Sequence, residues 1–233
     1  ALLETGLDVA AREPAWERAA GLDLERLADV RRRRKDDLLR LVGERTGTAL
    51  DPEALTVGFA RRFATYKRAD LLLGRPEELA ALLADPERPL QLVFAGKAHP
   101  DDVDGKAVLP RVAALAAGGS GRVVFLPGYD LALARALVQG VDVWLNLPRR
   151  FEEASGTSGM KAALNGTPSL SVLDGWWAEG YEPGIGWAIA GSGAATQAEQ
   201  DAADADELFR LLRDEVVPRY YGPDGLSGLG RAA

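Results

Sequence analysis

The chain has 233 residues, of which 28 are basic and 35 acidic, for a formal net charge of −7. This acidic balance argues against a general nucleic-acid binder, which usually carries a basic excess or a basic face. The chain contains no cysteine and a single histidine, His99, so disulfides, thiolate metal sites and multi-histidine metal sites are excluded and we expect no bound metal.

The amino-terminal segment has no leader pattern. Residues 1–14 carry acids and lack a basic start followed by an apolar stretch, so we predict no signal peptide. No apolar run reaches the roughly 18 residues that a membrane span needs. We therefore expect a cytoplasmic protein with neither a membrane nor a nucleic-acid partner. The only methionine is Met160, so an initiator methionine is absent and we expect a piece of a longer protein.

Residues 1–50 predict a helical lead-in segment. Leucine and valine recur at close to helical spacing from Leu22 to Val42. A run of five cations at 31–35 lies inside this pattern. The run is either an anion patch or a solvated helix face, and the two aspartates that follow it favour the solvated face.

From residue 55 onward, short apolar segments alternate with longer helical patterns. The expected strands are 55–59, 90–95, 122–126, 141–145 and 169–173, and the expected helices are 70–83, 105–117, 131–139, 157–164 and 201–215. Such alternation implies βαβ crossovers, and strands that are nearly continuous apolar runs imply burial on both faces. We predict an α/β fold with a doubly wound, Rossmann-like parallel sheet at 51–222, then a frayed or truncated tail at 223–233. Ligands of such sheets bind at the carboxyl ends of the strands.

The loop after the fourth expected strand carries small residues from Ala154 to Gly159, directly before a helical pattern. Backbone N–H groups at such a helix start converge on one point, where the helix dipole favours an anion. The alternative, that Thr157 or Ser158 simply caps a structural helix, stays open. Lys161 is either a counter-ion for a phosphate, an amine that forms an imine with an aldehyde cofactor, or a surface lysine.

A second cluster follows the first expected strand and contains four cations, Arg61, Arg62, Lys67 and Arg68. In a chain of negative net charge this local excess favours an anionic ligand. Arginine suits two-pronged phosphate contacts and lysine acts as a mobile point charge. The alternative, a solvated helix start, is weakened because cations are unfavourable at that end of a helix. For His99 we expect a structural role or a place at the edge of a ligand site.

Two adjacent tryptophans, Trp176 and Trp177, follow the fifth expected strand beside the carboxylates of Asp174 and Glu179. Aromatic planes next to carboxylates often line the face of a sugar. The same residues could pack a domain interface. The sequence leaves these two interpretations open.

The string at 153–161, Glu-Ala-Ser-Gly-Thr-Ser-Gly-Met-Lys, resembles the signature of the α-glucan (glycogen, starch, maltodextrin) phosphorylases. The strings at 62–68, 96–98 and 125–129 resemble further blocks of that family in the same order. The variants are similar to the shorter bacterial and archaeal branch, and the resemblance covers about residues 15–222.

The resemblance implies the carboxyl-terminal, cofactor-binding lobe of a two-lobed GT-B glycosyltransferase fold. In this family pyridoxal 5′-phosphate is held as an imine on the lysine that matches Lys161. The cofactor's phosphate exchanges a proton with orthophosphate, which takes the terminal α-1,4-linked glucose as α-D-glucose 1-phosphate with retention. The implied partners are an α-1,4-glucan, orthophosphate and the amino-terminal lobe of the same enzyme, which we expect to lie outside this chain. The family is often dimeric, which makes a homo-oligomer a candidate assembly.

The resemblance also implies roles for individual residues. Lys161, Arg62 and Lys67 would be catalytic, and the last two would hold the substrate phosphate with the Gly156 amide. The cofactor contacts would be Lys161, Thr157, Ser158, Gly159, Tyr129 and Arg61. The sugar hydroxyls would be contacted by Glu153 and by the amides of Ala154, Ser155 and Gly156. Two departures from the family are Arg61, which is lysine in longer members, and 151–152, which replace a Pro-containing pair.

Two other functions remain open at the level of sequence. A nucleotide-sugar-dependent glycosyltransferase lobe of similar fold would explain the sheet and the phosphate cradle, but it gives Lys161 no imine to form. A non-catalytic remnant would explain the expected absence of the amino-terminal lobe. Binding of pyridoxal phosphate would favour the phosphorylase over the nucleotide-sugar-dependent glycosyltransferase. Turnover of maltodextrin by this chain alone would exclude the non-catalytic remnant.

Overall fold

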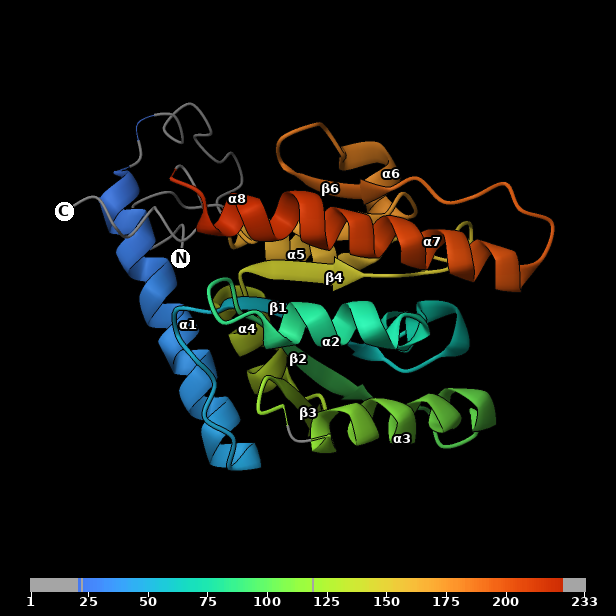
Figure 1. The fold of residues 1–233 in the computed structure, drawn as a ribbon, viewed down its shortest axis with the longest axis horizontal. Coiled ribbons are helices and arrows are strands. Elements are labelled where there is room, and N and C mark those ends of the chain that lie inside the picture. Colours follow the sequence, from blue (N-terminus) through green and yellow to red (C-terminus); the bar gives the residue numbers. More distant parts are fainter. Residues whose placement is uncertain (1–20, 22, 119, 224–233) are drawn as a thin grey trace.

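Six parallel strands form one sheet in the order β3-β2-β1-β4-β5-β6 in the computed structural model, which describes residues 21, 23–118 and 120–223 (Figure 1). The strands are β1 (Leu55–Arg62), β2 (Leu90–Lys97), β3 (Val123–Pro127), β4 (Val143–Asn146), β5 (Ser169–Val172) and β6 (Gly186–Ile189). The chain runs outward from β1 to β3 and then returns to the centre at β4. This reversal confirms the predicted doubly wound, Rossmann-like class.

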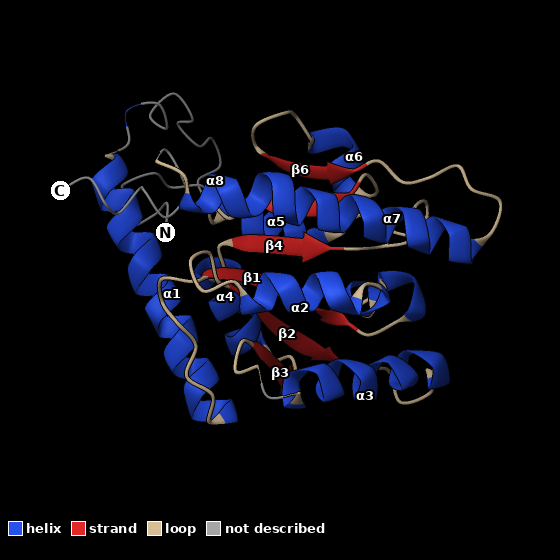
Figure 2. Ribbon diagram, in the orientation of Figure 1, coloured by secondary structure: helices blue, strands red, loops and turns tan. Residues whose placement is uncertain are grey.

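Helices cover both faces of the sheet (Figures 1 and 2). They are α1 (Leu24–Thr46), α2 (Pro76–Ala84), α3 (Val103–Ala117), α4 (Leu131–Gly140), α5 (Thr157–Leu164), α6 (Trp176–Gly180), α7 (Gln197–Leu211) and α8 (Val217–Tyr221). Side chains from α2, α3 and α7 share one apolar core with the strands, and side chains from α1, α4 and α5 share a second on the other face. No helix within the described ranges is both long and apolar enough to cross a membrane.

The expected helix at 70–83 is broken in the structure. A 3-10 turn occupies Leu71–Gly74, and α2 begins only at Pro76. Proline has no N–H to donate and its fixed φ suits the first turn of a helix, so the helix starts at this residue.

The last elements of the chain, from α6 to α8, also differ from the expectation. The final helix begins earlier than predicted, because Thr196 and Glu199 form a capping box, and it continues through a π turn at Leu212–Val216 into α8. The sequence pattern did not indicate α6 or β6. β6 is a four-residue edge strand with alternating burial, too short for its pattern to stand out.

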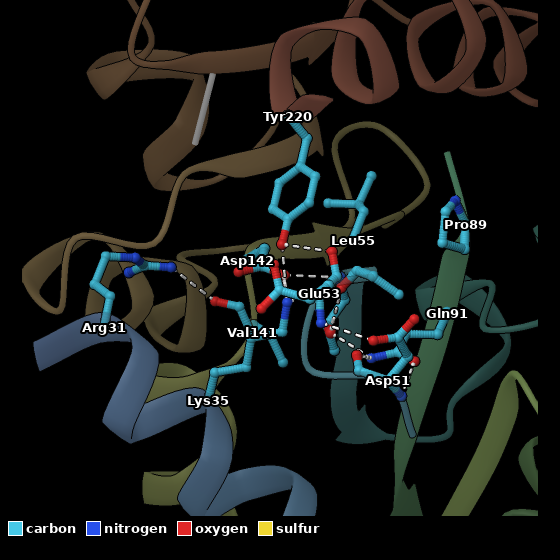
Figure 3. A network of polar contacts seen from close by, with 12 residues as sticks. Arg31, Lys35, Asp51, Glu53, Leu55, Pro89, Gln91, Val141, Asp142 and Tyr220 are labelled. Atoms are coloured by element: carbon cyan, nitrogen blue, oxygen red, sulfur yellow. Dashed lines mark hydrogen bonds and ion pairs between the residues drawn. The ribbon is translucent and has the colours of Figure 1, made fainter. Parts of the chain in front are cut away.

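The prediction of a solvated face for the cations at 31–35 is wrong at Lys35, which is buried (Figure 3). Its Nζ atom lies 2.6 Å from Asp142 Oδ2 and donates hydrogen bonds to the Ala54 carbonyl at 2.7 Å and to the Tyr220 hydroxyl at 2.9 Å. The same Asp142 oxygen accepts from the Thr56 amide at 2.8 Å. One lysine therefore joins α1 and α8 to the amino-terminal ends of β1 and β4.

Arg31 also faces the protein. Its guanidinium donates to the carbonyl of Gly166 at 2.9 Å and to that of Val141 at 3.1 Å. Burial lowers the pKa of Arg31, and the charge of Asp142 opposes that shift. Arg31 thus fixes the backbone at the amino-terminal end of β4.

Candidate functional site

The carboxyl-terminal ends of β1 and β4 lie side by side at the point where the strand order reverses. β1 ends at Arg61 and Arg62, and β4 ends at Asn146. Open α/β sheets bind ligands at this switch point. The two loops that leave these strands are therefore the expected place for a site.

The loop from β4 to α5 is tied to both neighbouring loops. The Arg149 amide donates to the Tyr66 carbonyl at 2.6 Å, on the β1 side. On the β5 side, the Glu153 amide donates to Asp174 Oδ2 at 2.9 Å, and the Trp176 amide donates to the Ser155 carbonyl at 2.9 Å. These bonds fix the position of the loop before any ligand is considered.

Three of the predicted site residues meet in one ion cluster. Lys67 Nζ lies 2.8 Å from Glu153 Oε1 and 2.6 Å from Oε2, and Arg61 Nη2 donates to Oε2 of the same carboxylate. All three side chains are nine-tenths or more buried. Burial would raise the pKa of Glu153, but the hydrogen bonds and charges of Lys67 and Arg61 lower it. Glu153 is therefore held as a carboxylate between two cations.

Several buried polar atoms around this cluster have no hydrogen-bond partner among the described residues. They are Nε and Nη1 of Arg61, Oδ1 of Asn146 and Nε1 of Trp176. A buried polar group without a partner is costly, so such atoms usually serve a ligand or water. Two unsatisfied guanidinium N–H groups beside a second cation fit the oxygens of a phosphate.

The start of α5 lies next to Glu153. Gly156 is its N-cap, with a left-handed φ of +74°, and no side chain in the described ranges caps the helix. The alternative in which the Thr157 or Ser158 hydroxyl caps a structural helix is therefore wrong. A Cβ at Gly159 would lie 2.6 Å from Trp176 Nε1 and 2.9 Å from Asn146 Nδ2, so only glycine fits there. Uncapped amides at a helix start suit an anion.

The other predicted residues lie around this cluster without joining it. Arg62, Thr157 and Lys161 are exposed, and within the described part of the chain no hydrogen bond or ion pair involves the side chain of Arg62 or Lys161. Tyr129 is partly buried; burial raises its pKa, and the charge of Arg61 opposes the shift, which places the two near each other. Ala154, Ser155 and Ser158 line the loop and the first turn, exposed or partly so.

The two tryptophans play different parts. Trp177 is buried and donates to the Trp187 carbonyl at 3.1 Å, so it belongs to the core. Trp176 packs against the start of α5 at Gly159. His99 is exposed and its Nδ1 accepts from the Asp101 amide at 3.2 Å, which is a local structural contact.

One cation was misassigned from the sequence, and the places of two polar residues in the site were not predicted. Arg68 was grouped with the anion-binding cations, but it is 3% exposed and binds Asp201 and Asp204. Asn146 was not singled out, and Asp174 was named only as a carboxylate beside the two tryptophans. Their signal was their position, because each lies at or just beyond the carboxyl end of a strand next to the switch point.

Replacing Glu153 by glutamine should lower the free energy of unfolding by about 2 kcal/mol at neutral pH, because Arg61 and Lys67 lose their counter-charge in a largely buried place. The pKa of Glu153 is lowered in the folded protein, so its contribution is full at neutral pH and is lost as the pH falls through that lowered pKa. The variant should therefore lose less stability on acidification. Denaturant unfolding at several pH values measures both effects.

The matched control is Glu207→Gln. Its carboxylate also has a lowered pKa, mainly through the hydrogen bond from Arg210, but that pair is solvent-exposed and should contribute little. Inorganic phosphate should raise the melting temperature of Glu153→Gln more than that of the parent, since the two cations become available. Equal stability of the Glu153 variant and the parent at all pH values would contradict the role of the cluster.

The segment that contains this ion cluster is similar in sequence to known proteins. The sequence profile of the carbohydrate phosphorylase family matches residues 20–182. The maltodextrin phosphorylase of Thermococcus litoralis is 46% identical over 212 residues, which are 90% of this chain and 26% of the relative. The glycogen phosphorylase of Aquifex aeolicus is 47% identical over 180 residues, 76% of this chain and 26% of the relative.

A third relative, the glycogen phosphorylase of Mycobacterium tuberculosis, is 49% identical over 180 residues, 76% of this chain and 21% of the relative. The chain thus spans about a quarter of the length of the proteins that it matches. The matched segment includes the ion cluster and the start of α5, from Arg61 to Lys161.

Proposed function

This chain belongs to the carbohydrate phosphorylase family, and from that membership we propose that it forms the cofactor-binding, carboxyl-terminal lobe of an α-glucan phosphorylase with a GT-B fold. The whole enzyme would transfer the terminal α-1,4-linked glucose of a glucan to orthophosphate and release α-D-glucose 1-phosphate. The observation that carries the proposal is that Arg61 and Lys67 meet at Glu153, in the loop that leads into the uncapped start of α5.

The residues present fit pyridoxal 5′-phosphate. The amides of the first turn of α5, with Thr157, Ser158 and Gly159, would receive its phosphate, and Tyr129 would lie near its ring. Lys161, one turn further along α5, would hold the cofactor covalently through its amine. The unsatisfied nitrogens of Arg61 support this arrangement, since they supply donors that no group of the described residues uses. When bound, the cofactor would supply a phosphate that exchanges a proton with orthophosphate.

The chain's own residues then have to hold two phosphates close together. Two such anions repel each other strongly where water is excluded, so cations must neutralise them. Arg62, exposed at the end of β1, and Lys67 would hold the substrate phosphate with the Gly156 amide. Glu153 and the amides of Ala154, Ser155 and Gly156 would orient the sugar hydroxyls. The rest of the sugar pocket would come from polypeptide outside this chain.

Arg62→Ala is expected to weaken the use of phosphate by about 2–4 kcal/mol, or about 30- to 900-fold in kcat/KM for phosphate, because a charge-assisted contact to the transferred group is lost in a desolvated site. The measurement is phosphorolysis of maltodextrin as a function of phosphate concentration, in the protein that contains the rest of the polypeptide. Arg135→Ala, an exposed arginine on α4, serves as the control. An unchanged dependence on phosphate in Arg62→Ala would reject the assignment.

A further inference from the structure

We propose that Arg68 is a positioning residue that fixes the distance between the two loops of the proposed site, and that it controls anion and cofactor affinity through Lys67 and Glu153. The inference rests on the proposed function, because the site that it supports is the proposed phosphate site. Arg68 would touch neither cofactor nor substrate, because it is 3% exposed and its guanidinium is occupied by two backbone carbonyls and two aspartates.

The side chain of Arg68 joins the β1 loop to the β4 loop. Its Nε donates to the Leu147 carbonyl at 2.9 Å, and its Nη2 donates to the Pro148 carbonyl at 2.9 Å. These two carbonyls lie where the backbone leaves β4 and enters the loop that carries Glu153. Arg68 itself directly follows Lys67. Each end of the Lys67–Glu153 contact is therefore attached to the same guanidinium by a short stretch of backbone.

The guanidinium also binds a third element. Its Nη1 lies 2.8 Å from Asp201 Oδ1 and its Nη2 lies 2.6 Å from Asp204 Oδ2, both on α7. Asp201 in turn pairs with Arg149 of the β4 loop at 3.0 Å. The planar fork of an arginine can make these contacts at once, whereas a lysine amine can make only a part of them. The two loops are thus fixed against a long helix as well as to each other.

The backbone at Arg68 is unusual for a residue with a side chain. Its φ is +48°, in the left-handed region, where it ends the 3-10 turn at Thr65–Lys67 and its amide donates to the Thr65 carbonyl at 3.0 Å. A non-glycine residue in this region costs about 1 kcal/mol or more and persists only where the surroundings enforce it. Here the contacts of the side chain enforce it, and the turn directs Lys67 toward Glu153.

The adjacent residues Lys67 and Arg68 therefore have different roles. Lys67 meets the carboxylate of Glu153, and Arg68 holds both loops so that this meeting occurs at 2.6–2.8 Å. Loosening Arg68 should let the loops move apart without removing any charge from the site. Misplacement of a binding group by about 1 Å can cost on the order of a hundredfold in function.

The test compares Arg68→Lys with Arg31→Lys in the full chain. The two arginines form a matched pair, since each donates to backbone carbonyls at one end of β4, Arg68 at its carboxyl end and Arg31 at its amino end. Titration of the apo chain with pyridoxal 5′-phosphate, followed by absorbance and fluorescence, gives the dissociation constant. We expect Arg68→Lys to raise it about tenfold or more and Arg31→Lys to change it less than about twofold.

A second measurement needs no cofactor. Titration of the Glu153 carboxyl by carbon-13 NMR should show its pKa rising toward the ordinary value in Arg68→Lys, because the contact with Lys67 loosens, and unchanged in Arg31→Lys. Equal effects of the two variants, or no effect of Arg68→Lys on either measurement, would overturn the inference. A parent chain that binds no pyridoxal phosphate would count against the proposed function, while the NMR titration would still decide the role of Arg68.

Discussion

Lys161→Ala is expected to abolish stable retention of pyridoxal 5′-phosphate by the chain. The proposal gives this amine the only covalent attachment, and the remaining contacts are reversible hydrogen bonds at the start of α5. The Lys161 amine is exposed and engages no other group among the residues described, so its loss should leave the fold intact. The measurement is the absorbance and fluorescence of cofactor that remains after incubation with an excess and removal of free ligand.

Lys106→Ala is the matched control, since Lys106 is another exposed helical lysine, on α3, to which the proposal assigns no contact with the cofactor. It should retain cofactor as the parent does. Retention by Lys161→Ala at the level of the parent would contradict the assignment of the lysine. A parent chain that retains no cofactor after exposure to an excess would contradict the proposed function as a whole.

Asp142→Ala should lower the free energy of unfolding by about 3–5 kcal/mol, because it leaves the Lys35 ammonium buried without its counter-charge. The same change removes the acceptor for the Thr56 amide at the start of β1. The effect lies at the amino end of the sheet, so cofactor affinity should change little in the fraction that is folded. Urea unfolding followed by circular dichroism measures the loss.

Two further variants show whether the charge pair itself is responsible. Asp37→Ala removes an exposed carboxylate that pairs with arginines on the same helix, and it should cost less than about 1 kcal/mol. The double variant Lys35→Met/Asp142→Leu should recover much of the lost stability, since apolar side chains can replace a buried pair at little cost. A loss in Asp142→Ala no larger than that in Asp37→Ala would contradict the account of this network.

The sheet could be predicted from sequence because its strands are buried on both faces. Runs such as 90–95 are apolar except for Gln91, and the helix predicted at 157–164 has those bounds in the structure. The helix expected at 70–83 was not predicted to break before Pro76, because the helical spacing of its apolar residues continues across the proline. β6 was missed because a strand of four residues, of which every second one is only partly buried, gives too short a pattern.

The burial of Lys35 could not be predicted from the local sequence. A run of cations on a helix is ordinarily solvated, and nothing nearby indicates which member turns inward. The partners that stabilise Lys35 lie 107 and 185 residues away, at Asp142 and Tyr220. Arg68 shows the same limit, because its acidic partners on α7 lie more than 130 residues further along the chain.

The candidate site was predicted in outline, and its internal contacts were not. Strand ends indicated that ligands bind at the loops that carry Arg61, Lys67 and residues 153–159, and the structure brings these loops together at the switch point. The resemblance implies that Glu153 contacts the sugar hydroxyls and that Arg61 and Lys67 contact phosphates. The structure instead places Glu153 directly between those cations, so an anion that binds both must displace or share this carboxylate.

The most direct test is to locate the attached cofactor by mass. The full chain is incubated with pyridoxal 5′-phosphate, reduced with borohydride and digested, and the modified peptide is sequenced. The chain has five lysines, Lys35, Lys67, Lys97, Lys106 and Lys161. The proposal predicts near-stoichiometric modification of Lys161 alone, with inorganic phosphate in excess slowing it. Modification spread over the exposed lysines, or none at Lys161, would contradict the assignment of the helix start and its cations as a phosphate site.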